Sequence, residues 1–533
     1  MLKETLIKLS RAISVPIYSG SYEGASPLVQ PHPKFSNLGD VIDRSRALGT
    51  PALIDLLHAG SPRVVSYAAF DAMADSFAQG LLARGHERGD RIAILAINCV
   101  EFFAAYCGMV RAGLVAVPVN IKFPRDMIAH VVHDAGAKLV VCDAARRADV
   151  PKDVSSVEFA ELSGEAMRRS GNRKPLVPIV PHDGEPAMFL YTSGSTGKPK
   201  GVVLSHQSHL WVATTRAATR DWSDQRLLVA APLYHMNALA LAQFASVAHA
   251  TVVLMPKFEA RQYIEAIATH QCTWLTSVPP MMAMMLREKD LLATSDLSSV
   301  RYIRMGSAPV SQSLIDGLKS YFPQASILNG YGTTEAGPVV FGPHPNGLPW
   351  PELSVGYPHP AVAMRLVNHA QRDVTEGVLE MKCPAIMQEY HNLPEATHRA
   401  MTADGYYNTG DIFRRDEQGF HYFVGRIDDV FVSGGENIAP GAVEKMLEQH
   451  AAIEQACVVP VADEIKGTKP VAFVTLKRGA VTSEAEIKAF ALAHGPAYAH
   501  PRRVWFLDAI PLSGTNKVDR KALMQDAEAR LRA

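Results

Sequence analysis

A run of small and polar residues from Tyr191 to Gly201 constrains the fold most. Its sequence is Tyr-Thr-Ser-Gly-Ser-Thr-Gly-Lys-Pro-Lys-Gly, and it follows the apolar residues 188–190, so we predict a strand that ends in a loop with little bulk. Glycine tolerates positive φ and close approach, so backbone N–H groups of such a loop can converge on an anion. Hydroxyls and two lysines add further donors. The loop is therefore predicted to bind phosphate.

Two other interpretations of this loop fit less well. A flexible Ser/Gly linker is not expected to carry Lys-Pro-Lys-Gly or to continue directly into the apolar residues 202–204. A nucleoside-triphosphatase P-loop needs four residues between its first glycine and its Gly-Lys pair, followed by Ser or Thr. Here two residues separate Gly194 from Gly197, and Pro199 follows the lysine. The sequence thus favours a phosphate loop that is not a P-loop.

Length and composition limit the class of protein. A chain of 533 residues exceeds what one hydrophobic core usually serves, so two or more domains are expected. The hydrophobic fraction of 47% and the charged fraction of 20% are those of a globular protein. Lys plus Arg equals Asp plus Glu at 53 each, so no overall basic field exists to attract nucleic acid. Any anion site must be local.

One segment has to be tested as a membrane span. Residues 227–256 contain no Asp, Glu, Lys or Arg, but Pro232, His235 and Asn237 interrupt them, so we expect a buried strand, helix and strand rather than a transmembrane segment. The six cysteines are scattered without metal-binding spacing, and residues 1–14 form no secretory signal. These features predict a cytoplasmic protein.

The hydrophobic pattern alternates between strands and helices along most of the chain. Such alternation predicts right-handed βαβ units and parallel sheets covered on both faces. The pattern changes to β-hairpin material and then to a small α+β unit, with a boundary near Asp428. We therefore predict an α/β protein with two domains. Residues 1–427 are expected to form layered, mostly parallel sheets with helices and a β-barrel-like part, and residues 428–533 a small mobile α+β domain.

Two further motifs follow predicted strands, where ligand loops of parallel sheets lie. Residues 329–337, Asn-Gly-Tyr-Gly-Thr-Thr-Glu-Ala-Gly, miss the Rossmann G-x-G-x-x-G because Glu335 takes the sixth place. That carboxylate would repel a dinucleotide pyrophosphate but would suit a metal–triphosphate. Residues 306–309, Gly-Ser-Ala-Pro, end another strand with small side chains, as a flat base against the backbone requires.

Three weaker signals could each be ordinary structure. Asp411 follows a glycine turn and could bind ribose hydroxyls, but it could equally belong to a common turn. His235 lies within the uncharged stretch, where a lone histidine is more often a core group than a catalyst. Lys517 lies on a polar turn before the last helix, which alone would indicate a solvated basic end.

Together and in this order, these motifs resemble the adenylate-forming superfamily of acyl-CoA synthetases, non-ribosomal adenylation domains and firefly luciferase. The resemblance extends from about Ser66 to Leu523. It implies an acid–CoA ligase that first converts a carboxylic acid and ATP into an acyl-adenylate and pyrophosphate, and then transfers the acyl group to CoA. ATP, Mg²⁺ and CoA are the implied cofactor and co-substrates.

The resemblance also implies roles for individual residues. Phosphate contacts would come from Thr192, Ser193, Gly194, Ser195, Thr196, Gly197, Lys198 and Thr334. The adenine site would comprise Tyr331 with Gly306, Ser307, Ala308, Pro309 and Asn329, and Gly330, Gly332 and Thr333 would also bind the cofactor. Glu335 would bind Mg²⁺, Asp411 and Arg426 the ribose, and Ser433, Gly434 and Gly435 the pantetheine. Asp428 would be the hinge, and Lys517 would promote adenylation with help from His235, Thr192 and Glu335.

The implied mechanism uses one site for two reactions. Lys517 would stabilise charge on the α-phosphate in the first step, and rotation about Asp428 would then withdraw it and present the pantetheine loop. One departure is Asn516, where the family often has glycine; the assignment rests on Lys517-Val518-Asp519-Arg520.

The acid and the acceptor stay open. Residues His235, Asn237 and Gly330 are expected to line the acid site. Gly330, where the family's acetate enzymes carry tryptophan, indicates a larger acid, whereas Asn237 favours a small polar one. Because residues 227–256 contain no carboxylate and no arginine, both an amino acid with its ammonium group and a dicarboxylate are disfavoured. The remaining alternatives are delivery to a carrier protein and a non-catalytic nucleotide-binding protein; a homodimer is possible.

Overall fold

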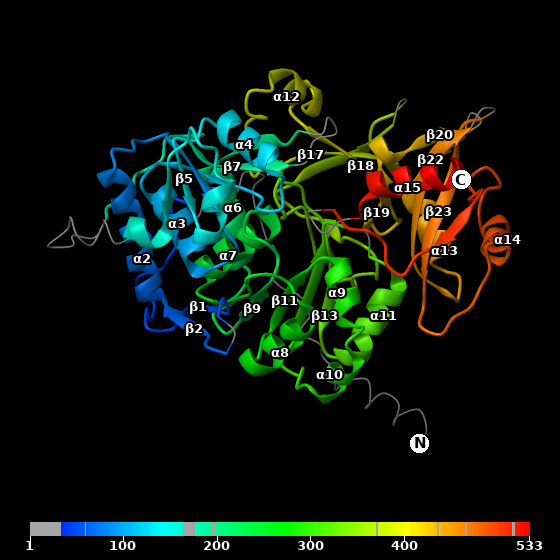
Figure 1. The fold of residues 1–533 in the computed structure, drawn as a ribbon, viewed down its shortest axis with the longest axis horizontal. Coiled ribbons are helices and arrows are strands. Elements are labelled where there is room, and N and C mark those ends of the chain that lie inside the picture. Colours follow the sequence, from blue (N-terminus) through cyan, green and yellow to red (C-terminus); the bar gives the residue numbers. More distant parts are fainter. Residues whose placement is uncertain are drawn as a thin grey trace.

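The computed structural model describes residues 34–58, 60–163, 176–192, 198–308, 310–368, 371–433, 436–463, 466–513 and 518–532 (Figure 1). Within these ranges, no helix combines the length and the apolar character that crossing a membrane requires. The uncharged stretch forms parts of strand β9, helix α7 and strand β10, as predicted.

A six-stranded sheet carries the phosphate loop. Its order is β6-β5-β3-β4-β7-β8, and all neighbours are parallel except β7 and β8. The strands are β3 (Arg91–Leu95), β4 (Val115–Pro118), β5 (Leu139–Cys142), β6 (Ser156–Glu158), β7 (Pro186–Thr192) and β8 (Lys200–Ser205). Associated helices are α2 (Tyr67–Ala83), α3 (Val100–Arg111), α4 (Arg125–Asp134), the 3₁₀ helix η1 (Ala144–Asp149) and α6 (His206–Ala217). The predicted phosphate loop thus connects two antiparallel strands.

A seven-stranded sheet carries the two nucleotide motifs. Its order is β13-β12-β11-β9-β10-β1-β2, parallel except between β1 and β2. The strands are β1 (Pro51–Asp55), β2 (Arg63–Ser66), β9 (Arg226–Val229), β10 (Thr251–Leu254), β11 (Trp274–Ser277), β12 (Tyr302–Gly306) and β13 (Ser326–Gly330). Its helices are α7 (Met236–Ala248), α8 (Ala260–His270), α9 (Pro279–Met285), α10 (Lys289–Thr294) and α11 (Gln312–Tyr321).

Three hydrophobic cores separate these sheets into layers. Successive side chains of a strand point to opposite faces, so each sheet supplies two cores. In β9, Leu227 and Val229 join the central core, which includes α6, α7 and strands of both sheets, while Leu228 joins the outer core with α8, α9 and α11. A third core packs α4 on the far face of the six-stranded sheet. The prediction of layered, mostly parallel sheets is confirmed.

The part predicted to resemble a β-barrel is an antiparallel sheet of order β16-β17-β18-β19. Its strands are β16 (Ala363–Val367), β17 (Glu376–Lys382), β18 (Tyr407–Arg415) and β19 (His421–Arg426), accompanied by β14 (Phe341–Gly342), β15 (Tyr357–Pro358) and α12 (Pro394–Ala400). Strand β18 pairs Asp411 with Arg426 of β19. This sheet therefore brings the two predicted ribose residues together.

The C-terminal elements form a separate α+β unit, coloured orange to red in Figure 1. They are the 3₁₀ helix η2 (Ile427–Asp429), β20 (Phe431–Ser433), β21 (Glu436–Ile438), α13 (Pro440–Leu447), β22 (Ile453–Asp463), β23 (Gly467–Leu476), α14 (Glu484–His494), β24 (Val504–Phe506) and α15 (Arg520–Arg532). Two cores on the two faces of the β22-β23-β24 sheet contain buried residues from Phe431 onward only. The domain boundary at Asp428 stays a prediction.

Candidate active site

Two of the predicted loops start at the same edge of the seven-stranded sheet. Strands β12 and β13 are parallel, and Gly306 pairs with Gly330 at their carboxyl ends. A Cβ added to Gly306 would lie only 2.9 Å from the Gly330 carbonyl oxygen, so the close approach of the two strand ends requires glycine. Ser307 follows with a φ of 67°, a left-handed conformation that few side chains adopt. The two motifs therefore begin at closely spaced strand ends, and the backbone of the first is strained at Ser307.

Tyr331 and Asp411 are joined directly. The Tyr331 hydroxyl donates a hydrogen bond of 2.6 Å to Oδ2 of the buried Asp411, and Arg426 Nη1 donates one of 2.9 Å to Oδ1. Edge-on contacts with Phe413 at 4.8 Å and Phe341 at 5.9 Å fix the Tyr331 ring. Burial and the neighbouring carboxylate raise the pKa of Tyr331 well above its ordinary value, so the hydroxyl stays a donor.

Glu335 lies beside the phosphate-loop hairpin. Its Oε1 accepts a hydrogen bond of 2.8 Å from the Tyr390 hydroxyl, and the Lys200 ammonium stands 4.3 Å from the centre of the same Tyr390 ring. The main chain supports this arrangement, because Met387 N–H donates to the Glu335 carbonyl oxygen at 2.6 Å and Tyr390 bridges to Val202 of β8. Tyr390 belongs to no recognisable motif, and sequence reasoning missed it.

The donor set around Glu335 fits Mg²⁺ held mainly by phosphate oxygens. Mg²⁺ keeps several waters and is usually bound through one or two carboxylates plus substrate phosphates. Among the residues that the structure describes, no group of three His, Cys, Asp or Glu side chains could cage a metal ion. Glu335 supplies one carboxylate next to Lys200 and the end of the phosphate-loop hairpin, which matches that mode of binding.

The other predicted nucleotide residues surround this edge. Asn329 Nδ2 donates to the Leu353 carbonyl oxygen at 2.9 Å, and Thr333 Oγ1 accepts from Ala336 N–H at 3.1 Å. Gly332 approaches Pro338 so closely that a Cβ would lie 2.6 Å from its Cα. Ala308 and Thr334 are half-buried in the same two loops.

Several predicted site residues lie outside the described residues, namely Ser193, Gly194, Ser195, Thr196, Gly197, Pro309, Gly434, Gly435 and Lys517. Their neighbours are placed. Thr192 pairs with Lys200 across the phosphate hairpin, Ser433 pairs with Glu436, and Leu512 pairs with Val518. Lys198 is exposed just before β8.

The predicted hinge residue is accessible at the junction with the C-terminal unit. The Asp428 side chain is 70% exposed and lies 3.8 Å from the guanidinium of Arg426. Polar contacts across the junction include Lys445 Nζ, which donates to the Phe423 carbonyl oxygen at 2.6 Å, and Arg287, which lies 3.7 Å from Glu454. The start of α13 also packs on β19, where a Cβ on Gly441 would lie 2.7 Å from the Val424 carbonyl oxygen.

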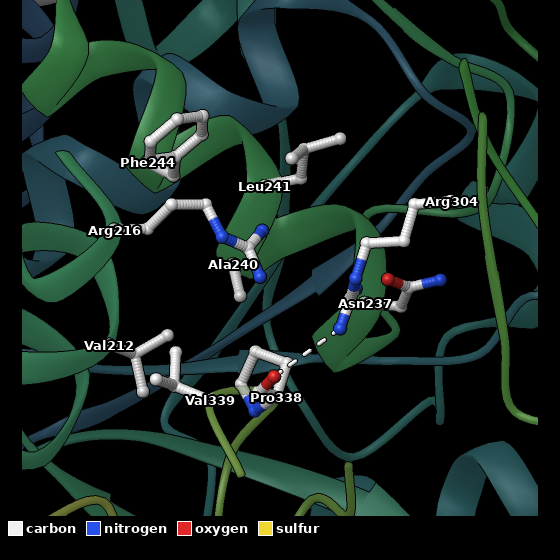
Figure 2. A pocket seen from close by; sticks show the side chains of 9 residues that line it. All are labelled: Val212, Arg216, Asn237, Ala240, Leu241, Phe244, Arg304, Pro338 and Val339. Carbon is white, nitrogen blue, oxygen red and sulfur yellow. Dashed lines mark hydrogen bonds between the residues drawn. The ribbon is translucent and has the colours of Figure 1, made fainter. Parts of the chain in front are cut away.

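A pocket beside the strand edge contains Asn237 but also two arginines, Arg216 and Arg304 (Figure 2). His235 precedes α7 as its N-cap residue, and its ring contacts the edge of Tyr234 at 4.7 Å. Both arginines lie outside residues 227–256, the uncharged stretch on which the expectation against a dicarboxylate rests. Gly330 adjoins the pocket, because a Cβ there would lie 2.8 Å from the Arg304 guanidinium carbon.

Comparisons with known proteins agree with these motifs. The AMP-binding enzyme family matches residues 43–391, and the AMP-binding enzyme C-terminal domain matches residues 442–517. The long-chain-fatty-acid–CoA ligase FadD13 of Mycobacterium tuberculosis is 30% identical over 92% of this chain and 99% of its own length. The 4-coumarate–CoA ligase 2 of Solanum tuberosum is 30% identical over 94% of this chain and 93% of its own.

Solved structures are similar over most of the fold. ATP-bound MatB from Rhodopseudomonas palustris is 25% identical with a TM-score of 0.82, over 92% of this chain and 99% of its own. The o-succinylbenzoate CoA synthetase of Bacillus subtilis, in complex with its acyl-adenylate intermediate, is 26% identical with a TM-score of 0.75, over 86% of this chain and 93% of its own.

Proposed function

The chain belongs to the AMP-binding enzyme family as an adenylate-forming acid–CoA ligase, and we propose how its residues divide the two half-reactions. In the first, a carboxylate oxygen of the acid attacks the α-phosphorus of ATP, and pyrophosphate leaves. In the second, the CoA sulfur attacks the acyl carbon, AMP leaves, and the thiol proton passes to solvent.

The observation that carries this assignment is the convergence of three elements at one strand edge. The paired strand ends Gly306 and Gly330 are followed by a loop that carries both Tyr331 and Glu335. Tyr331 is bonded to Asp411 of β18, and Glu335 to Tyr390, whose ring lies against Lys200 of β8. Tyr331 would stack on the adenine, with residues 306–309 opposite, Asn329 at its amino edge and Gly332 and Thr333 beside it. Asp411 and Arg426 would bind the ribose hydroxyls.

We propose that Glu335 holds Mg²⁺, which, when bound, neutralises charge on the triphosphate. Residues Thr192 to Lys198 and Thr334 would hold the β- and γ-phosphates. Lys517 would stabilise the charge that develops on the α-phosphate, since a preorganised cation in such a place typically contributes about 10²–10³ in rate. His235 would lie beside the reacting carboxylate, with Asn237 and Gly330 further along the acid's path.

The second half-reaction requires the lysine to leave. We propose that residues 428–533 rotate about Asp428, whose side chain is exposed, so that Ser433, Gly434 and Gly435 guide the pantetheine of CoA. We also propose a cytoplasmic location, since all six cysteines are free thiols and ATP and CoA are available there.

Pyrophosphate release across a panel of carboxylic acids, with and without CoA, tests the proposal. The expected result is acid-dependent pyrophosphate release, with a CoA thioester formed when CoA is present. Absence of release with every acid would refute adenylation. Release without a CoA thioester would redirect the second step to a carrier protein; a relative at 30% identity, the fatty acid–[acyl-carrier-protein] ligase ScoC of Streptomyces coeruleorubidus, is named for such a reaction.

A further inference from the structure

The pocket beside the strand edge is built from a regular face of helix α7. Asn237, Ala240, Leu241 and Phe244 follow the spacing i, i+3, i+4 and i+7, so one stripe of the helix faces the cavity. The segment Pro338–Val339, directly after the Glu335 loop, closes another side. The pocket therefore lies between α7 and the nucleotide motifs.

Arg304 enters this pocket because of strand alternation. In β12, Ile303 and Met305 are fully buried in the outer core, so Arg304 between them points to the opposite face. Its Nη2 donates to the Pro338 carbonyl oxygen at 3.3 Å, and its guanidinium lies against Gly330, where a Cβ would come within 2.8 Å. The glycine leaves the space that this guanidinium fills.

Arg216 enters from the last turn of α6, one turn after Val212, which also lines the pocket. Its guanidinium carbon lies 5.7 Å from the centre of the Phe244 ring and 5.6 Å from that of Trp274. Figure 2 shows the two guanidinium groups extending toward the same space from opposite sides. The nearby His359 is buried, and burial together with the Arg216 charge lowers its pKa to about 4, so it stays neutral.

Among the described residues that line it, the pocket consequently has two permanent positive charges and no carboxylate. We propose that the acid activated by this enzyme is a dicarboxylic acid: one carboxylate reacts with ATP, and the other is bound by Arg216 and Arg304. The inference rests on the proposed function, since it assigns the pocket to the acid. Guanidinium groups are planar donors that bind carboxylates in bidentate geometry, and both sit against aromatic or backbone surfaces that orient them.

The expectation that a dicarboxylate is disfavoured considered only residues 227–256, which supply the α7 wall. The charge comes from α6 and β12 instead.

Length-matched acids test the inference on the intact wild-type enzyme. Pyrophosphate release is measured with succinate against butyrate, glutarate against valerate, and adipate against hexanoate. A hydrogen bond to a charged group corresponds to about a ten- to hundredfold effect, so the best dicarboxylate is expected to exceed its monocarboxylate in kcat/KM by at least about tenfold. Equal or better use of the monocarboxylates would overturn the dicarboxylate inference and leave the ligase assignment intact, whereas no release with any acid would overturn both.

Substitutions test whether Arg216 and Arg304 cause the preference for the dicarboxylate over the monocarboxylate. Arg304→Met and Arg216→Met are each expected to lower kcat/KM for the dicarboxylate about tenfold or more while retaining or raising that for the monocarboxylate, which also shows that the variants fold. Arg304→Lys should restore part of the preference. Arg220→Gln is the matched control, because Arg220 packs over Trp222 at 3.8 Å outside the pocket. A preference that survives both Met substitutions would overturn the assignment to these arginines, as would a loss of preference in the Arg220 variant of the same size.

Discussion

Arg520 and Glu444 form the ion pair that should most affect the C-terminal unit. Arg520 donates to both oxygens of Glu444, at 2.7 and 2.8 Å, and to the Val458 carbonyl oxygen at 2.8 Å. Glu444 also accepts from Val458 N–H at 2.7 Å. Burial lowers the pKa of Arg520, but the charge of Glu444 and its hydrogen bonds outweigh that effect and raise it overall. The pair thus joins α13, β22 and α15.

Arg520→Met is expected to destabilise this unit by about 3 kcal/mol. The substitution would leave Glu444 buried with one fewer charged partner, and breaking a buried ion pair costs about 3–5 kcal/mol. The lower end applies because the Arg520 side chain is 28% exposed, against 10% for Glu444. Replacing both residues with Met should cost less than replacing Arg520 alone, since no buried charge then lacks its partner.

Hydrogen exchange of peptides from β22 and β23 measures the effect locally. A loss of about 3 kcal/mol corresponds to opening about a hundredfold more often. Arg532→Met is the control on the same helix, because Arg532 and Glu528 are 77% and 52% exposed, and such surface pairs contribute about 0–1 kcal/mol. Equal exchange in the Arg520 and Arg532 variants, or a double variant less stable than Arg520→Met, would refute the reasoning.

The same substitution has an expected functional consequence. The segment that contains Lys517 is anchored before and after, through the Leu512–Val518 bridge and a hydrogen bond of 2.8 Å from Asp519 N–H to the Pro511 carbonyl oxygen. Arg520 directly follows this anchor and fixes the start of α15. Arg520→Met should therefore slow pyrophosphate release more than it slows thioester formation from supplied acyl-adenylate.

Three further outcomes are expected. Lys517→Ala should abolish adenylation but keep thioester formation from supplied acyl-adenylate; equal loss of both half-reactions in single-turnover assays would contradict the rotation. Tyr331→Phe removes the donor to Asp411 and should raise the KM for ATP about tenfold with the KM for the acid unchanged, a split that steady-state kinetics checks. Burial raises the pKa of Glu448 to about 7, so the folded state holds this proton more tightly and stability falls as pH rises from about 4.5 to 7. Glu448→Gln should thus gain about 1–2 kcal/mol over wild type at pH 8 and progressively less toward pH 4.5, which urea midpoints across this pH range measure.

The layered fold was predictable because each element carries its own local signal. Helix α2 has a Ser66 cap and a regular apolar face, and α8 follows Glu259, whose side chain accepts hydrogen bonds from the N–H groups of Arg261 and Gln262. The short buried strands are bounded by glycine and polar turns. These signals depend on neighbours a few residues apart, so they can be recognised without knowledge of tertiary contacts.

The nucleotide motifs were also recognisable, but the residues that complete them were not. Tyr390 reaches Glu335 from 55 positions away, and Arg216 looks in the sequence like an ordinary basic residue in the last turn of a helix. Arg304 offered one usable signal, a charge between two apolar residues of a strand directly before Gly306-Ser307. Side chains that meet only through tertiary packing show no characteristic spacing in the sequence.

Gly330 links the two binding sites in one strand end. A Cβ on Gly306 would lie 2.9 Å from the Gly330 carbonyl oxygen, so the two nucleotide loops can start this close together because residue 306 is glycine. The missing side chain of Gly330 in turn makes room for the Arg304 guanidinium. A larger residue at this position would first displace the flexible end of Arg304, because the guanidinium is the nearest neighbour of a Cβ at residue 330. Under the dicarboxylate proposal, a side chain at position 330 would act on the acid through Arg304, so glycine at this position would reflect the charge of the acid rather than its length.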